Sequence, residues 1–178
     1  MLKIIIGVVI ATVVVIGGFL LLDPKQSNPD ITVVDSKNSY TIEGEVNKSG
    51  TYKLEGESLT FQDLLDAAGG LTSNGDERTY FETTEITINS TYYVAPKYDV
   101  NDVCNNKEIE KVNINSDNES ELLKISGITN AIASSIVSYR TENGSFTYLE
   151  QLMDVYGIGN ATYRKIRNYV ILHEWSFF

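Results

Sequence analysis

The chain has 178 residues and a formal net charge of −10, with one cysteine, Cys104, and one histidine, His173. A single cysteine excludes a disulfide within the chain, and the sequence has no metal-ligand spacing, nucleophile–base pair or phosphate-binding P-loop. It also lacks a carboxylate or His/Asp cluster that could hold Mg²⁺ for a nuclease. We therefore expect that the protein is not an enzyme and has no metal or cofactor site.

The first predicted element is an uncharged apolar run of 19 residues, 4–22. At about 1.5 Å per residue, a helix of this length spans roughly 28 Å, close to the ~30 Å hydrocarbon core of a bilayer. Lys3 precedes the run and Asp23 follows it, so the N-terminus should be cytoplasmic and the remaining chain extracellular. A cleaved signal peptide is the alternative, but its apolar region is shorter and ends in small residues. We predict that residues 1–22 comprise a single-pass anchor in a bacterial cell membrane.

An α+β unit is predicted after the anchor. Residues 23–30 contain two prolines among polar residues and indicate a linker. Within 31–100, apolar and polar residues alternate as in short strands, and Thr60 can cap one helix that ends at Gly69. One helix on a small mixed sheet is the simplest arrangement. The predicted strands are 40–46, 51–54, 85–88 and 91–98.

The segment 68–72, Ala-Gly-Gly-Leu-Thr, is the most distinctive part of this unit, and it is accompanied by 43–46, 50–52 and 92–96. Together these segments resemble a soluble-ligand-binding β-grasp (SLBB) domain over 40–98. Members of that family bind small ligands in some proteins and act as assembly modules in others. No residue pattern marks a ligand pocket here, so the resemblance implies self-association ahead of ligand binding.

A duplicated motif dominates the C-terminal part. Residues 101–111 are polar and indicate a second linker, and 173–178 form a short tail. In the region between them, 112–172, Gly-Ile-Thr-Asn-Ala at 127–131 returns as Gly-Ile-Gly-Asn-Ala at 157–161. Each copy lies between segments of helical periodicity, so each predicts helix, tight glycine turn, helix. The sequence therefore predicts an all-α bundle with a pseudo-twofold repeat.

Two capping boxes and two longer helices are expected in this bundle. Ser116 should cap the first helix with Glu119 three residues later, and Thr147 should cap the third helix with Glu150. The second helix is predicted over Asn130–Arg140 and the last over Asn160–Leu172. The apolar residues of each helix recur on one face and should form a common core.

The duplicated turn resembles the helix-hairpin-helix (HhH) motif, whose paired copies are a DNA-binding unit without sequence specificity. Over 112–171 the chain resembles the C-terminal domain of the ComEA-type DNA receptors of natural competence. An uncleaved anchor, an SLBB domain and paired HhH motifs are the layout of that family in Gram-positive bacteria. The matching segments are 112–115, 121–123, 126–128, 139–140, 143–146, Leu152 and 157–159.

The turns themselves explain how such a unit holds DNA. Each directs unpaired backbone N–H groups toward a phosphate, and basic side chains can add charge-assisted contacts. The first copy departs from the family pattern because Thr129 replaces the second glycine and basic residues are missing. Thr129 would be strained if the turn needs a positive φ, whereas its hydroxyl could donate to a phosphate or cap the helix. The candidate DNA-binding residues are Gly127, Ile128, Thr129, Asn130, Gly157, Ile158, Gly159, Asn160, Ala161, Arg164, Lys165 and Arg167.

The net charge of the chain does not by itself favour DNA binding. Residues 31–110 carry 6 basic and 15 acidic side chains, whereas 113–178 carry 5 and 7, so the HhH region is nearly neutral. DNA binding must therefore depend on local geometry. The resemblance implies a receptor for extracellular double-stranded DNA, with an uptake channel and a competence pilus as partners. The alternative is a surface assembly or ligand-binding protein whose HhH bundle makes only protein contacts.

Overall fold

The structure is a computed structural model that describes residues 38–99 and 107–175. Ser36–Phe178 form one compact unit, and its two hydrophobic cores lie in what we call the N-terminal lobe (38–99) and the C-terminal lobe (112–172). The predicted anchor and first linker lie outside the described residues. No helix among those residues is long and apolar enough to span a bilayer.

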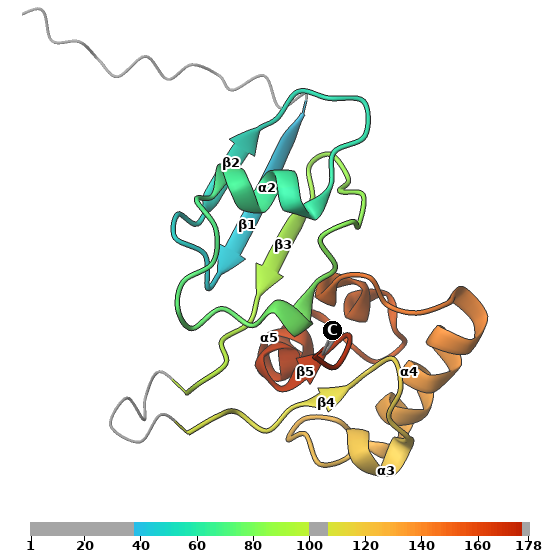
Figure 1. Ribbon diagram of the computed structural model, residues 1–178. Coiled ribbons are helices and arrows are strands. Elements are labelled where there is room, and N and C mark those ends of the chain that lie inside the picture. Colours follow the sequence, from blue (N-terminus) through green and yellow to red (C-terminus); the bar gives the residue numbers. More distant parts are fainter. Residues whose placement is uncertain (1–37, 100–106, 176–178) are drawn as a thin grey trace, which may run out of the picture. The chain divides into compact units, whose positions relative to one another are not determined.

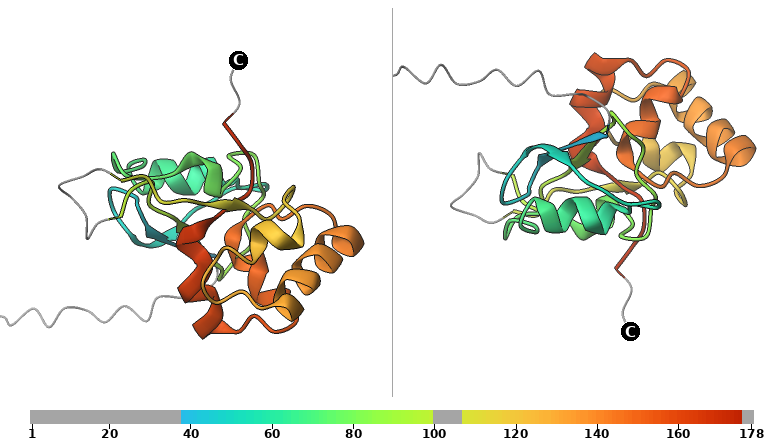
Figure 2. Two further views of the ribbon diagram at one scale, coloured as in Figure 1. Left: turned by 90° about the horizontal axis from the view of Figure 1, so that it is seen from below. Right: turned by 90° about the horizontal axis from the view of Figure 1, so that it is seen from above.

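The N-terminal lobe is a small sheet with one helix on a face (Figures 1 and 2). Its strands occur in the order β2-β1-β3. Strand β1 pairs antiparallel with β2, placing Tyr40 opposite Tyr52, and parallel with β3, placing Ile42 opposite Tyr92. The elements are β1 (Ser39–Gly44), β2 (Gly50–Lys53), helix α2 (Phe61–Ala67), the 3-10 helix η1 (Glu77–Thr79) and β3 (Thr91–Val94). The core comprises Tyr40, Ile42, Val46, Phe61, Leu64, Leu65, Ala68, Tyr80, Ile86, Tyr92 and Val94.

The predicted ends of helix α2 are confirmed. The Thr60 backbone N–H and hydroxyl both donate to Asp63, each at 2.8 Å, which closes the N-terminal turn. At the other end Gly69 and Gly70 have φ of 79° and 82°, a conformation that glycine adopts without steric cost. The predicted strand over 85–88 is wrong: Glu85 makes only an isolated bridge with Thr60. The last strand ends at Val94, four residues earlier than predicted.

The C-terminal lobe is mostly helical, with a two-stranded parallel pair closing its ends. Its elements are β4 (Val112–Asn113), α3 (Glu119–Leu122), α4 (Asn130–Asn143), the 3-10 helix η2 (Leu149–Asp154), α5 (Asn160–Ile166), the 3-10 helix η3 (Arg167–Tyr169) and β5 (Val170–Ile171). Its core includes Leu122, Ile125, Ile136, Phe146, Leu149, Leu152 and Ile166.

Three local predictions for this lobe are wrong. The last helix ends at Ile166 instead of Leu172, because Val170 and Ile171 pair with β4. The first helix is capped by Asn118, whose side chain accepts from the Glu121 N–H at 3.1 Å, and not by Ser116. In the second predicted box the acceptor is Gln151, which receives the Thr147 N–H at 2.7 Å, and not Glu150.

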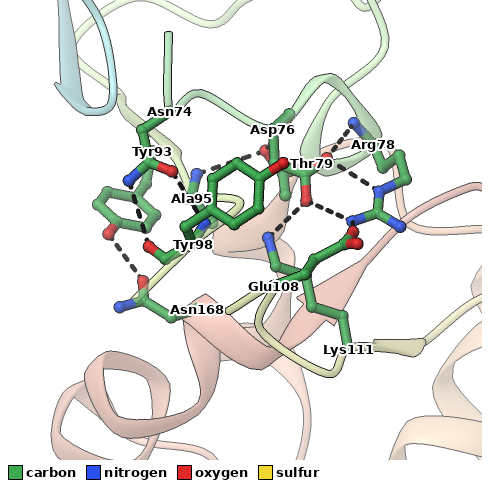
Figure 3. Close-up of polar contacts among 10 residues, drawn as sticks. All are labelled: Asn74, Asp76, Arg78, Thr79, Tyr93, Ala95, Tyr98, Glu108, Lys111 and Asn168. Atoms are coloured by element: carbon green, nitrogen blue, oxygen red, sulfur yellow. Dashed lines mark hydrogen bonds and ion pairs between the residues drawn. The ribbon is translucent and has the colours of Figure 1, made fainter. Parts of the chain in front are cut away.

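Shared packing joins the two lobes, and a buried ionic network attaches the segment between them to the N-terminal lobe (Figure 3). Tyr93 belongs to the C-terminal core, and its hydroxyl donates to Asn168 at 2.8 Å. Asp76 is fully buried, and its Oδ2 accepts hydrogen bonds from Arg78 Nη2 at 2.9 Å and from Lys111 Nζ at 2.6 Å. Burial alone would raise the pKa of Asp76, but the hydrogen bonds from Arg78 and Lys111 hold it below its usual value. Lys111 lies in the predicted second linker and anchors that segment to the N-terminal lobe.

Candidate nucleic-acid interface

The two copies of the motif form turns of the same geometry, which we call the first turn (125–131) and the second turn (155–161). Each is closed by a backbone hydrogen bond, from the Ile128 N–H at 3.1 Å or the Ile158 N–H at 3.0 Å, to the residue three positions earlier. Gly127 and Gly157 have φ of 114° and 90°. These glycines permit the sharp change of direction between helices.

The central isoleucines of the turns hold them to the core. Ile128 is 7% exposed and Ile158 is 4% exposed. Their side chains face the protein, so of these two predicted site residues only the backbone is available to a ligand. The residues that follow each isoleucine are exposed: Thr129, Asn130 and Ala131 in the first turn, and Gly159, Asn160 and Ala161 in the second.

In the first turn the helix is partly capped by its own side chain. Thr129 has φ of −98°, so the strain that a positive φ would impose does not arise. Its hydroxyl accepts the Ile132 N–H at 3.3 Å, and its carbonyl receives the Ala133 N–H at 2.8 Å. The N–H groups of Asn130 and Ala131 have no acceptor within the described residues and point from the start of α4.

In the second turn the corresponding position has no side chain. Gly159 has φ of −94°, which any residue can adopt, and a Cβ built there would meet nothing within 4 Å. Neither backbone conformation nor internal packing therefore requires glycine at this position. The N–H groups of Asn160, Ala161 and Thr162 have no acceptor in the parts of the chain that the structure describes. The open space lets an external group approach them closely.

Two basic side chains lie beside these turns. Arg164 and Lys165 are exposed and form no ion pair with a described residue. Lys165 belongs to α5, yet its Cδ lies 3.1 Å from where a Cβ on Gly127 would be. The side chain thus follows the first turn, which has no basic residue of its own. In sequence Lys165 follows the second turn, and spacing alone gives no sign of its contact with the first.

The structure places the third predicted cation, Arg167, differently. Its guanidinium lies 3.6 Å from the centre of the Tyr93 ring and 3.8 Å from Glu43, both in the N-terminal lobe. It is therefore part of the contact between lobes. Two other cations near the turns are also engaged: Arg140 donates to the carbonyls of Ile114 and Asp117, both at 2.7 Å, and Lys124 pairs with Glu121.

A half-buried carboxylate lies next to this contact. Glu150 lines a groove that also includes Glu43 and Arg164, and its Oε1 accepts the Tyr163 hydroxyl at 2.7 Å. Its Oε2 is buried without a hydrogen-bond partner among the described residues. Burial raises the pKa of Glu150 to about 7, against the weaker opposing effect of the Tyr163 hydrogen bond. The sequence predicted Glu150 as a capping residue and gave no sign of this burial.

This carboxylate should make the folded protein less stable at higher pH. The folded state keeps a proton on Glu150 up to pH about 7, whereas the unfolded chain releases it near 4.5. Stability should therefore fall across that interval, by at most about 3 kcal/mol. Urea unfolding of residues 36–178 at pH 5 and pH 8 should show a smaller loss in Glu150→Gln than in wild type. Glu142→Gln, an exposed glutamate of α4, is the control; equal losses in Glu150→Gln and wild type would contradict the prediction.

Comparison with known families agrees with this description. Residues 39–81 match the family model of the SLBB domain. Residues 107–171 match that of the helix-hairpin-helix motif, and this match contains both turns. The two regions follow each other in the order predicted from the sequence.

Three curated relatives show how far the similarity extends. An uncharacterised protein of Haemophilus influenzae is 44% identical over 63 residues, 35% of this chain and 56% of that protein. ComE operon protein 1 of Bacillus subtilis is 29% identical over 137 residues, 71% of this chain and 66% of that protein. Endonuclease/exonuclease/phosphatase family domain-containing protein 1 of Homo sapiens is 40% identical over 58 residues, 33% of this chain and 10% of that protein. The chain covers less than two thirds of each relative, and its two matched regions lie in the order SLBB domain, then helix-hairpin-helix motif.

Proposed function

We propose that this protein is a membrane-anchored receptor that binds extracellular double-stranded DNA through its phosphates, without reading sequence, for uptake in natural transformation. The observation that carries the proposal is the second turn. There, three N–H groups without an acceptor among the described residues, a glycine without steric purpose and the exposed Arg164 lie together, while Lys165 lies beside the first turn. The helix-hairpin-helix match and the similarity to ComE operon protein 1 support the same function.

The chemistry of the two turns suits a phosphate backbone. Backbone N–H groups at a helix start attract an anion, and arginine and lysine add charge-assisted hydrogen bonds. Contacts of this kind position DNA but carry no sequence information. Because Lys165 follows the first turn while Arg164 remains with the second, each turn has one cation, despite the near-neutral charge of the lobe.

The cellular setting is also part of the proposal. The apolar run 4–22 would hold the protein in the cell membrane with the turns outside. By resemblance to the ComEA-type receptors, the bound DNA would pass to an uptake channel and a competence pilus would act with it. The SLBB domain would allow copies to associate on DNA.

The direct test is fluorescence anisotropy of residues 36–178 with two unrelated 30-bp duplexes over a series of salt concentrations. The whole compact unit is used because Tyr93 contributes to the C-terminal core. We expect equal affinity for both duplexes and a slope of about −2 to −4 in log K against log salt, for two to four neutralised phosphates. No binding at low salt would overturn the proposal and leave the bundle as a protein-contact module.

Gly159 provides a sharper test of the second turn. The equivalent Thr129 shows that threonine fits this backbone and caps the helix. Gly159→Thr should change the free energy of unfolding by less than about 1 kcal/mol. It should nevertheless weaken DNA binding about tenfold, because the hydroxyl would occupy one of the three N–H groups, as Thr129 does in the first turn, and leave two for the phosphate. Gly50→Thr in β2, another glycine with open space, is the control; undiminished affinity in Gly159→Thr would contradict the phosphate contact.

A further inference from the structure

Tyr156, in the second turn, is the most exposed large apolar side chain of the described residues. It is 87% exposed, whereas Ile88, the next, is 48% exposed. Within the described part of the chain, neither its hydroxyl nor its ring has a hydrogen-bond or stacking partner. Single exposed apolar residues are common on protein surfaces, so exposure alone does not indicate a function. Its surroundings are more informative.

The backbone holds Tyr156 rigidly outward. Val155, immediately before it, is 3% exposed, and Ile158, two residues later, is 4% exposed. The hydrogen bond from the Ile158 N–H to the Val155 carbonyl closes the turn around it at 3.0 Å. Two buried anchors therefore fix the backbone from which the aromatic side chain projects, so only the rotamer freedom of the side chain is lost when the ring contacts a partner.

The side chain lies near both turns. A Cβ on Gly157, the next residue, would be 3.3 Å from Ile132 Cγ1 in helix α4. Tyr156 also lines a shallow groove that runs along α4 from Ala131 to Asn143 and includes the carboxylates of Glu142 and Asp154. The first residues of α4 carry the N–H groups of the first turn that have no acceptor among the described residues. Tyr156 thus projects from the second turn beside the helix that begins at the first turn.

We propose that Tyr156 contacts the sugars and base edges of the DNA groove that lies between the phosphates held by the two turns. This inference rests on the proposed function. A surface between two phosphate-binding turns faces a groove, whose floor offers apolar sugar and base-edge surface. The tyrosine ring supplies rigid contact area there, and its hydroxyl can meet groove acceptors. Such a contact exchanges no counterions with the DNA.

The salt dependence of binding separates this contact from the phosphate contacts. In the anisotropy assay with residues 36–178, Tyr156→Ala should lower affinity about 5- to 50-fold with an unchanged salt slope, while Tyr156→Phe should retain most of the affinity. Lys165→Gln should instead reduce the magnitude of the slope by about 0.9. Tyr98→Ala, an exposed tyrosine of the N-terminal lobe, is the control, and thermal melting checks that each variant is folded.

Each result has a distinct meaning. If wild type binds DNA and Tyr156→Ala binds equally well, the groove contact is overturned and the proposed receptor function stands. A smaller salt slope in Tyr156→Ala, or a loss in Tyr156→Phe as large as in the alanine variant, would also overturn the ring contact. If wild type binds neither duplex, the result contradicts the proposed DNA-binding function, and with it the groove contact that rests on that function. The result that supports the groove contact is a loss of affinity in Tyr156→Ala but not in Tyr156→Phe, with the salt slope unchanged.

Discussion

Replacing Asp76 with alanine is expected to lower the free energy of unfolding by about 3–5 kcal/mol. Asp76 is fully buried, and the side chain of its partner Lys111 is only 1% exposed. Removing the carboxylate would leave Lys111 and Arg78 with uncompensated charge in a poorly solvated site. Burial already lowers the pKa of Lys111 with Asp76 opposing it, so without Asp76 the lysine should lose its proton more readily.

Urea unfolding of residues 36–178 measures this effect. Glu108→Ala is the matched control, because Glu108 pairs with the same Arg78 at 3.1 Å but its side chain is 58% exposed. An exposed partner of this kind contributes less than about 1 kcal/mol. Equal destabilisation by the two substitutions would show that the network does not depend on the buried carboxylate.

Reversing the charge of Arg164 and Lys165 together should abolish most DNA binding. Two hydrogen bonds to charged groups contribute roughly 3 kcal/mol or more, so Arg164→Glu/Lys165→Glu should lose on the order of 100-fold in affinity. The salt slope should also fall by about two units. Arg167 is left unchanged because it contacts Tyr93 and Glu43, and its substitution would disturb the lobes themselves.

The control for this double variant has to change the net charge equally. Lys48→Glu/Lys53→Glu does so at two exposed lysines of the N-terminal lobe. If general electrostatic attraction governed binding, both double variants would weaken it alike. Anisotropy should instead show a large loss only for the substitutions in α5. Affinity retained by the α5 variant would contradict the proposed phosphate contacts.

Features with a strong local signal could be predicted from the sequence. The repeated glycine turns, the Thr60 cap and the termination of α2 just before Gly69 and Gly70 follow from residue types at fixed spacing, and the structure has them as predicted. Strands β4 and β5 have two residues each, too short for a periodic pattern, so their pairing was missed and the last helix was predicted too long. The local sequence likewise did not show whether Ser116 or Asn118 caps helix α3.

The candidate site was predictable in its backbone and less so in its side chains. Proximity in sequence grouped Arg164, Lys165 and Arg167, but their partners depend on which lobe each faces. Arg167 lies on Tyr93, a residue 74 positions earlier in the chain, and Lys165 lies over Gly127 of the other copy. Tertiary packing of this kind leaves no periodic trace in the sequence.

The shared core has a thermodynamic consequence. Since Tyr93 and Ala95 are buried with the helices of the C-terminal lobe, opening that lobe exposes part of the N-terminal lobe as well. The two lobes should therefore melt in one cooperative step. A ligand held by the turns then protects strands that it never touches, by the same linkage free energy that it contributes to its own lobe. Ligand binding at the turns would in this way increase the resistance of the N-terminal lobe to unfolding.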